Sequence, residues 1–148
     1  MITIREYEER DWAAICRVHD RARPDELRDS CDPGAFVPIE QDPEVKDLRR
    51  AHKHVACDGE RVVGFVGVDG TYLAWLYVDP DYYGQGIGRR LLQLGLEEIG
   101  TGAWTIVLHE NRRAIQLYES EGMTEVHRFE SDNAGYPCTC LRLEQGSD

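Results

Sequence analysis

The feature that most constrains the fold is a run of three apolar segments separated by two Asp-Gly pairs. The segments are His54–Cys57, Val62–Val68 and Tyr72–Val78, with Asp58-Gly59 and Asp69-Gly70 between them. Asp-Gly favours the tight two-residue turns whose twist matches that of paired antiparallel strands. The pattern therefore predicts an antiparallel meander of three strands.

Shorter patterns on both sides of this meander predict the other elements. Asp11 is typical of a helix N-cap, and Asn111 begins a second capped helix. Prolines break residues 22–43 into a loop with helical turns, and a short helix follows, with Asp42 as its N-cap, to about Ala51. A further helix runs from the glycine-rich segment to about Ile99, strands are expected at Ile2–Arg5, Trp104–Leu108, Glu125–Phe129 and Cys138–Leu143, and residues 144–148 are a flexible tail.

Composition limits the class of protein. The chain has 148 residues, of which 41% are hydrophobic, and this suits one domain over residues 1–148. Its apolar runs are far shorter than the about 20 residues of a membrane-spanning helix, and charges near the N-terminus argue against a secretory signal. Five cysteines without zinc-ligand spacing indicate free thiols in a reducing compartment, so we expect a cytoplasmic protein. A net charge of −11 opposes binding to nucleic acid.

Three glycines alternate at Gly84, Gly86 and Gly88, between the end of a strand and the start of a helix. Backbone N–H groups in such a loop point one way and bind an anion, helped by the helix dipole. A Walker loop would need Gly-Lys-Ser/Thr where Arg89-Arg90 follows the last glycine. A dinucleotide fingerprint needs GxGxxG within a βαβ unit, and this loop is GxGxG after a meander. Both nucleotide interpretations are therefore disfavoured.

Two stretches of sequence resemble a known family. LYVDPDYYGQGIGRRLL and ENRRAIQLYESEGM are similar to motifs of the GNAT superfamily of acetyl-CoA-dependent N-acetyltransferases, and the similarity covers roughly residues 54–130. The family's pyrophosphate motif runs Arg or Gln, two residues, Gly, one residue, Gly or Ala. This chain departs from it at the first position. The first motif falls on Tyr83, Gly86 and Gly88, and the second falls on Asn111, Ala114, Tyr118 and Gly122.

The resemblance implies an α/β (α+β) fold. In it a mixed, mostly antiparallel sheet of six to seven strands is flanked by about four helices and splayed between the fourth and fifth strands. Pantetheine would lie in the gap between Tyr72–Val78 and Trp104–Leu108. Four arginines at the two helix starts, Arg89, Arg90, Arg112 and Arg113, would attract the anionic cofactor or stay partly solvated. The residues implied to bind acetyl-CoA are Leu76, Tyr77, Val78, Tyr83, Gly84, Gln85, Gly86, Ile87, Gly88, Arg89, Asn111 and Tyr118.

The same resemblance implies how acetyl transfer would proceed. Tyr118 is the candidate acid for the leaving thiolate, because a phenol stays protonated at neutral pH; the alternative is a core aromatic at helical spacing. A backbone N–H near Tyr77 or Val78 would stabilise the oxyanion. Many relatives carry a Glu on the strand that matches Tyr72–Val78, and this chain has none there. We therefore expect either a low-pKa acceptor amine or a base from elsewhere, the candidates being His54, His109 and Asp69.

Residues 22–50 are expected to form the acceptor pocket. Their acidic side chains would favour a cationic amine, although such a run is also typical of solvated surface. His52 and His54 suggest a metal-binding pair, but only His54 falls in an expected strand and no third ligand is evident. We therefore expect no metal. The acidic residues concerned are Asp25, Glu26, Asp29, Asp32, Glu40 and Asp42.

Together these observations predict an enzyme that transfers an acetyl group from acetyl-CoA to a primary amine, by direct attack in a ternary complex. The amine could belong to a small molecule or to a peptide or protein. Two alternatives remain: a non-catalytic CoA-binding regulatory module, and an acyltransferase that uses another acyl-CoA or an alcohol acceptor. Neither nucleic acid nor a membrane is an expected partner, whereas exposed strands in the family often pair into homodimers.

Overall fold

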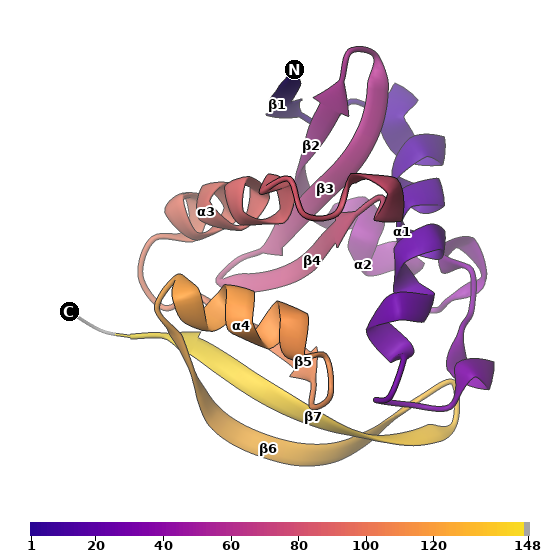
Figure 1. Cartoon of the computed structure of the whole chain (residues 1–148), viewed down its shortest axis with the longest axis vertical. Coiled ribbons are helices and arrows are strands. Elements are labelled where there is room, and N and C mark those ends of the chain that lie inside the picture. The colour runs from indigo at the N-terminus through magenta and orange to yellow at the C-terminus, as the bar shows by residue number, and fades with distance from the viewer. Residues whose placement is uncertain (147–148) are drawn as a thin grey trace.

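The computed structural model describes residues 1–146, and seven strands in this part of the chain form one mixed sheet (Figure 1). The strand order is β1-β2-β3-β4-β5-β7-β6, and every pairing except that of β4 with β5 is antiparallel. The predicted mixed, mostly antiparallel α/β fold is confirmed. The strands are β1 Ile2–Glu6, β2 His52–Asp58, β3 Arg61–Asp69, β4 Tyr72–Val78, β5 Trp104–Leu108, β6 Met123–Asn133 and β7 Tyr136–Gln145, and the α-helices are α1 Trp12–Leu27, α2 Val45–Arg50, α3 Ile87–Ile99 and α4 Arg112–Ser120.

The predicted meander is confirmed as β2, β3 and β4. β4 has the predicted bounds, and β2 begins two residues earlier than predicted, at His52. Gly59 and Gly70 lie in the two turns with left-handed φ angles of 62° and 61°. Glycine adopts this conformation at little cost because it has no Cβ, so the two Asp-Gly pairs set the register of the hairpins.

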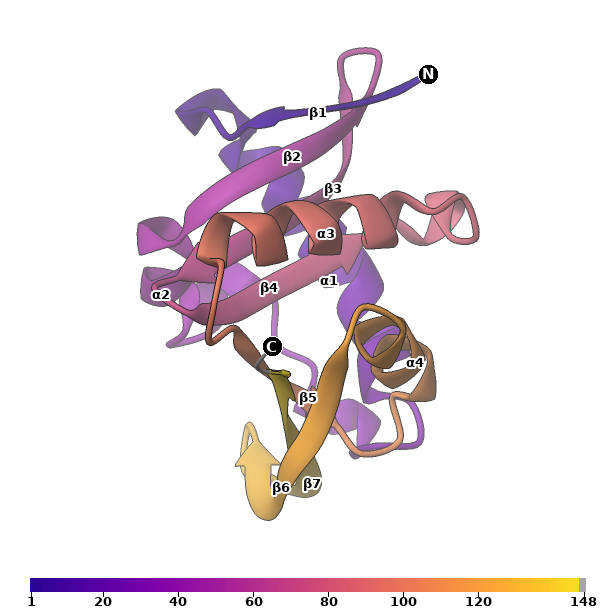
Figure 2. The same cartoon turned by 90° about the vertical axis from the view of Figure 1, so that its left-hand side faces the viewer.

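β4 and β5 separate after a single pairing. Within the described residues, they pair in parallel only at Tyr72 and Trp104, whose rings stack with their centroids 4.1 Å apart. Figure 2 shows the two strands diverging from there. The Thr105 hydroxyl of β5 still donates a hydrogen bond to the Leu73 carbonyl of β4 at 2.7 Å. The edge of β4 that follows has backbone N–H and C=O groups that β5 does not pair. This confirms the predicted splay between the fourth and fifth strands.

Helices cover both faces of β2, β3 and β4. α3 packs on one face and α1 on the other, and Figure 2 shows α3 in front of these strands with α1 behind them. β3 is buried along almost its whole length because its side chains alternate between two cores. Val66 packs with Leu91 under α3, whereas Phe65 packs with Ile15 of α1. The two cores hold β4 and α3 in place, and with them the glycine-rich loop that joins the two.

α1 continues to Leu27, so residues 22–27 are helical and do not belong to the predicted loop. Pro24 has no N–H and cannot complete its helical hydrogen bond. However, Ala22 and Leu27 are buried, and the Pro24 carbonyl accepts a hydrogen bond from the Arg28 N–H at 3.1 Å. Burial of the helix against the rest of the protein outweighs the proline here, and tertiary packing of this kind overrides local propensity.

α2 also begins later than predicted. The Asp42 carboxylate accepts a hydrogen bond from the Glu44 N–H at 2.8 Å, and this contact closes a turn before the helix. The first helical residue is therefore Val45, not Pro43. The short helix predicted for this region is confirmed, with its end at Arg50.

The C-terminal strand is longer than predicted. β7 continues to Gln145, whose N–H donates to the Ala103 carbonyl at 2.8 Å, so the predicted tail begins as strand. Residues 147–148 of that tail lie outside the described part of the chain. Cys138 and Cys140 are both buried, as predicted for packing, and all five cysteines are free thiols. No helix within residues 1–146 combines the length and apolar character needed to cross a bilayer.

Candidate active site

A cleft of about 740 Å³ opens where β4 and β5 diverge. Its walls come from the C-terminal end of α1, the end of β4, the glycine-rich loop and the start of α4. Of the residues predicted to bind acetyl-CoA, all but Gln85 line it. These are Leu76, Tyr77, Val78, Tyr83, Gly84, Gly86, Ile87, Gly88, Arg89, Asn111 and Tyr118.

Gly84 and Gly86 give the loop a shape that other residues rarely adopt. Their φ angles are 78° and 79°, and Gly86 is the N-cap of α3. A Cβ at either position would meet no protein atom within 4 Å, so the loop backbone is uncovered on that side. Gly88 differs, because a Cβ there would contact Leu117 and Val78 at 3.6 and 3.7 Å. Uncovered N–H groups at a helix N-terminus fit a phosphate-bearing ligand.

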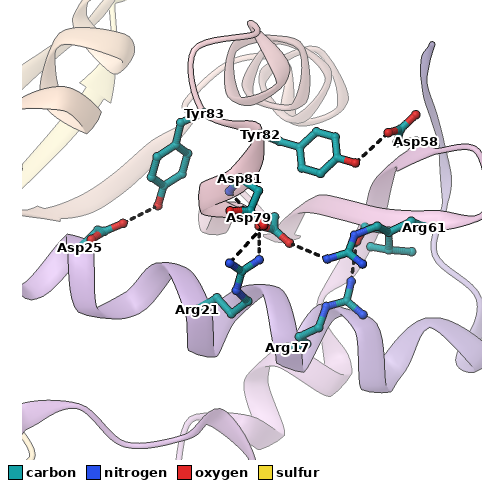
Figure 3. Close-up of polar contacts among 10 residues, drawn as sticks. Arg17, Arg21, Asp25, Asp58, Arg61, Asp79, Asp81, Tyr82 and Tyr83 are labelled. Atoms are coloured by element: carbon teal, nitrogen blue, oxygen red, sulfur yellow. Dashed lines mark hydrogen bonds and ion pairs between the residues drawn. The ribbon is translucent and has the colours of Figure 1, made fainter.

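Asp79 ties the start of this loop to two other elements (Figure 3). Its carboxylate, which is 0% exposed, accepts hydrogen bonds from Arg21 of α1, from Arg61 of β3 at 3.4 Å and from the Asp81 N–H at 2.9 Å. Burial alone would raise the pKa of Asp79, but the Asp81 N–H and the two guanidinium groups outweigh burial and lower it. Sequence patterns give no sign of this network, because its members lie far apart along the chain.

Tyr83 occupies the position where the GNAT-like motif has Arg or Gln. Its hydroxyl donates a hydrogen bond to Asp25 of α1 at 3.1 Å, and the Arg113 guanidinium of α4 lies 3.8 Å from the centroid of its ring (Figure 3 shows the first contact). Burial, followed by the Asp25 carboxylate, raises the pKa of Tyr83 to about 12, so the phenol is neutral. Tyr83 has no charge of its own but holds a cation beside the loop through its ring face.

The four arginines at the two helix starts do not all reach the cleft. Arg89, Arg112 and Arg113 line it. Arg90 instead donates a hydrogen bond to the Ile2 carbonyl of β1 at 3.2 Å, on the other side of α3. Three of the four predicted cationic side chains therefore line the cleft, where Arg89 and Arg112 also pair with the carboxylates of Glu121 and Glu110.

Tyr118 belongs to both the core and the wall of the cleft. It is 7% exposed, packs in the core cluster under α3 and lines the cleft. Burial raises the pKa of Tyr118, the negative charge of Glu26 adds to the rise, and the Thr105 side chain opposes it. The phenol therefore remains a proton donor at neutral pH. Asn111, the N-cap of α4, orients the helix that bears Tyr118, because its side chain accepts a hydrogen bond from the Ala114 N–H at 3.4 Å.

None of the three candidate bases named from the sequence lies at the cleft. His54 is on β2, and Asp69 belongs to the β3–β4 turn, where it lines a separate pocket of about 140 Å³. His109 follows β5, and its Nδ1 lies 2.8 Å from the Glu110 carboxylate, but it does not line the cleft. The structure instead brings Glu26 of α1 to the cleft. The sequence places Glu26 among the acidic residues of the acceptor side, but the prolines of that segment predict a loop and give no sign that a helix positions this carboxylate.

The six acidic residues named from the sequence for the acceptor side fall into three groups. Some line the cleft, some accept hydrogen bonds from nearby backbone N–H groups in local turns, and one is solvated surface. The solvated-face interpretation thus holds for one of the six, and the acceptor-side role of those that line the cleft stays a prediction. Asp25, Glu26 and Asp29 line the cleft, Asp32 and Asp42 accept local N–H groups at 2.7 and 2.8 Å, and Glu40 is exposed.

A third side chain joins the histidine pair, contrary to the expectation from sequence. His52 and His54 both lie on β2, and Glu98 of α3 completes a group whose ligand atoms are within 4.8 Å of one another. Sequence patterns miss Glu98 because only the packing of α3 on β2 brings it there. His52 also lies 3.3 Å from the Glu6 carboxylate. The three side chains could hold a metal ion, and none of them lines the cleft.

Residues 49–125, more than half of the chain, match the sequence profile of the acetyltransferase (GNAT) domain. The chain belongs to the GNAT family. The matched segment includes the meander, the glycine-rich loop, α3, β5 and α4, which together build most of the cleft. The resemblance inferred from the two motifs is therefore confirmed.

Two curated relatives of this GNAT chain are versions of the peptidyl-lysine N-acetyltransferase YjaB. The Salmonella typhimurium protein is 35% identical over 86 residues, which cover 58% of this chain and 59% of that protein. The Escherichia coli protein is 30% identical over 114 residues, which cover 73% of this chain and 77% of that protein. The match to the Salmonella protein thus spans less than two thirds of its length.

Solved GNAT structures share the fold over nearly the whole chain. The apo form of Escherichia coli YjaB has a TM-score of 0.73 at 27% identity and covers 100% of this chain and 99% of its own. A GCN5-related N-acetyltransferase from Rhodopseudomonas palustris has a TM-score of 0.84 at 18% identity, covering 98% and 95%. YncA from Salmonella typhimurium, solved with its cofactor acetyl-CoA, has a TM-score of 0.71 at 18% identity, covering 100% and 96%. The last two likenesses show the fold alone.

Proposed function

We propose that this GNAT protein transfers an acetyl group from acetyl-CoA to a primary amine. The observation that supports it most is the cleft, in which an uncovered glycine loop at a helix N-terminus adjoins an unpaired strand edge and a buried phenol. The relatives agree, since YjaB is a peptidyl-lysine N-acetyltransferase and YncA was solved with acetyl-CoA. A lysine side chain in a peptide is therefore the first acceptor to test, followed by small-molecule amines.

The residues present fit acetyl-CoA at both ends of the cleft. The N–H groups of residues 84–88 and the positive end of the α3 dipole suit the diphosphate, and Arg113 adds a cation beside them. The edge of β4 at Leu76, Tyr77 and Val78 suits the amide groups of the pantetheine arm, which would add to the sheet as another strand does. When bound, acetyl-CoA supplies a thioester with an electrophilic carbonyl carbon and a thiolate leaving group.

In the proposed reaction Tyr118 acts at the leaving group. Its phenol, kept protonated by burial, donates a proton to sulfur as the C–S bond breaks. A backbone N–H near Tyr77 or Val78 donates to the carbonyl oxygen, which gains negative charge during the attack. The acceptor nitrogen attacks the carbonyl carbon directly, so no residue of the chain becomes acetylated as an intermediate.

The acceptor would enter from the side of residues 22–50. The C-terminal end of α1 places the carboxylates of Asp25, Glu26 and Asp29 on this wall of the cleft. A cluster of negative charge raises the local concentration of a cationic amine and disfavours an acidic one. The same wall would disfavour nucleic acid as a partner.

Thiol release from acetyl-CoA over a panel of amines tests the proposal. We expect release only when an amine is present, with the acetylated amine detected by mass spectrometry. Thiol release that leaves the protein itself acetylated would contradict direct attack. Other acyl-CoA donors and alcohol acceptors belong in the same panel, because the cleft would accept their common CoA part equally well. Tight coenzyme A binding without turnover on any acceptor would identify a regulatory CoA-binding module.

A further inference from the structure

The proposed transfer needs a group that takes a proton from the attacking amine, and β4 offers none. Its seven residues, Tyr72–Val78, contain no carboxylate, imidazole, amine or guanidinium group. The three candidates named from the sequence lie outside the cleft. Glu26, in the last turn of α1, lines the cleft and is 24% exposed. Its carboxylate is thus held in the protein and still reachable from the cavity.

The contacts of Glu26 leave one of its carboxylate oxygens free. Oε1 accepts a hydrogen bond from the Tyr77 hydroxyl at 2.7 Å and another from the Arg23 guanidinium. Oε2 has no hydrogen-bond partner within residues 1–146. Arg23 is itself held by Asn133, whose Oδ1 accepts from its other nitrogen at 2.8 Å, so α1 is fastened to the end of β6 (Figure 1). One oxygen is fixed in position, and the other can meet a ligand.

Glu26 also acts electrostatically on the two phenols of the cleft. Burial raises the pKa of Tyr77 well above its ordinary value, and the charge of Glu26 raises it further. The same two causes raise the pKa of Tyr118, although Glu26 and Tyr118 share no direct hydrogen bond. Glu26 and Tyr118 both line the cleft, so a ligand bound there can face both side chains.

We propose that Glu26 accepts the proton of the acceptor amine through Oε2, an inference that rests on the proposed acetyl transfer. The cationic acceptor first loses one proton to solvent. As the nitrogen of the resulting neutral amine bonds to the carbonyl carbon, it gains positive charge, and its N–H becomes acidic enough for a carboxylate to take the proton. The C–S bond breaks, and the sulfur receives the phenol proton of Tyr118. The proton on Glu26 then returns through solvent to the Tyr118 phenolate, which restores both side chains.

Glu26→Gln is the direct test. Gln retains an oxygen that can accept from the Tyr77 hydroxyl, which preserves the packing, but it cannot take a proton. We expect kcat with a lysine peptide to fall about 10²- to 10⁴-fold, with an unchanged Kd for coenzyme A. Glu119→Gln is the charge-matched control, because Glu119 follows Tyr118 in sequence but is exposed on α4. This control should keep wild-type kcat.

Glu26→Asp separates proton transfer from a purely structural role. Asp keeps a carboxylate but is too short to accept the hydrogen bond from the Tyr77 hydroxyl. A structural role of Glu26 therefore predicts that Glu26→Asp lowers kcat at least as much as Glu26→Gln does. Proton transfer predicts that Asp restores part of the kcat that Gln loses. Should Glu26→Gln fail to fold, Glu26→Asp and Tyr77→Phe replace it, with losses in kcat expected for both.

The outcomes separate this inference from the proposed function. A wild-type protein that acetylates amines, together with a folded Glu26→Gln variant of equal kcat, overturns the role of Glu26 and leaves the proposed function standing. Wild-type kcat in both Glu26→Asp and Tyr77→Phe would likewise overturn the role of Glu26 and leave the proposed function standing. A wild-type protein that binds coenzyme A but acetylates no amine overturns both.

Discussion

Substituting Gly86 by Ala tests the phosphate-binding loop, and the chain supplies a matched control in Gly59→Ala. Both glycines have left-handed φ angles, 79° and 62°, and a Cβ at either meets no protein atom within 4 Å. An L-residue in this conformation costs about 1–2 kcal/mol. For a chain of this size that corresponds to a fall in Tm of about 2–8 °C. The two variants should therefore lose similar stability.

Only Gly86→Ala should weaken the binding of coenzyme A. Gly86 lines the cleft, and its methyl group would cover N–H groups that the diphosphate needs, whereas Gly59 lies in the β2–β3 turn. A hydrogen bond to a charged group contributes about 1.5–3 kcal/mol, which is about a 10- to 150-fold change in Kd. Isothermal titration calorimetry with coenzyme A measures this difference, and circular dichroism gives Tm. Equal Kd values for the two variants would refute the proposed phosphate site.

Three further predictions concern the acid and the anchor of the loop. Tyr118→Phe should lower kcat about 10²- to 10⁴-fold without changing the Kd for coenzyme A, and unchanged turnover would remove Tyr118 from its role. Because burial raises the pKa of Tyr118, wild-type kcat should show no loss from ionisation of this phenol below about pH 10. Asp79→Asn should cost about 1–3 kcal/mol at pH 7, measured by urea unfolding. Because the pKa of Asp79 is lowered in the folded state, its carboxylate stabilises the fold above the ordinary carboxyl range near pH 4, and this stabilisation is lost as pH falls below that range. A difference in unfolding free energy between wild type and Asp79→Asn that stays constant down to about pH 2 would contradict this.

Local signals explain what could be predicted from the sequence. The meander follows from Asp-Gly turns between apolar strands, and each of these features is encoded within a few residues. The glycine loop is similar, because Gly84 and Gly86 directly specify the left-handed backbone conformation of the loop. Asn111 signals the start of α4 through a cap that it forms with a residue only three positions away.

Contacts between distant segments explain what could not be predicted. Pro24 marks its surroundings as a loop, but burial of Leu27 keeps α1 helical and so carries Glu26 to the cleft. The network of Asp79 joins α1, β3 and the loop, and no periodicity in the sequence links these three elements. Glu98 likewise meets His52 and His54 only because α3 packs on β2. Side-chain partners of this kind require the fold.

The central claim is that the glycine loop and the open edge of β4 hold acetyl-CoA together. Titration of the ¹⁵N-labelled protein with coenzyme A, followed through its amide resonances, tests this claim most directly. We predict the largest shifts at Gly84, Gly86 and Gly88 and at the β4 amides of Leu76, Tyr77 and Val78. Shifts confined to other parts of the chain, or no shifts at saturating coenzyme A, would contradict the account.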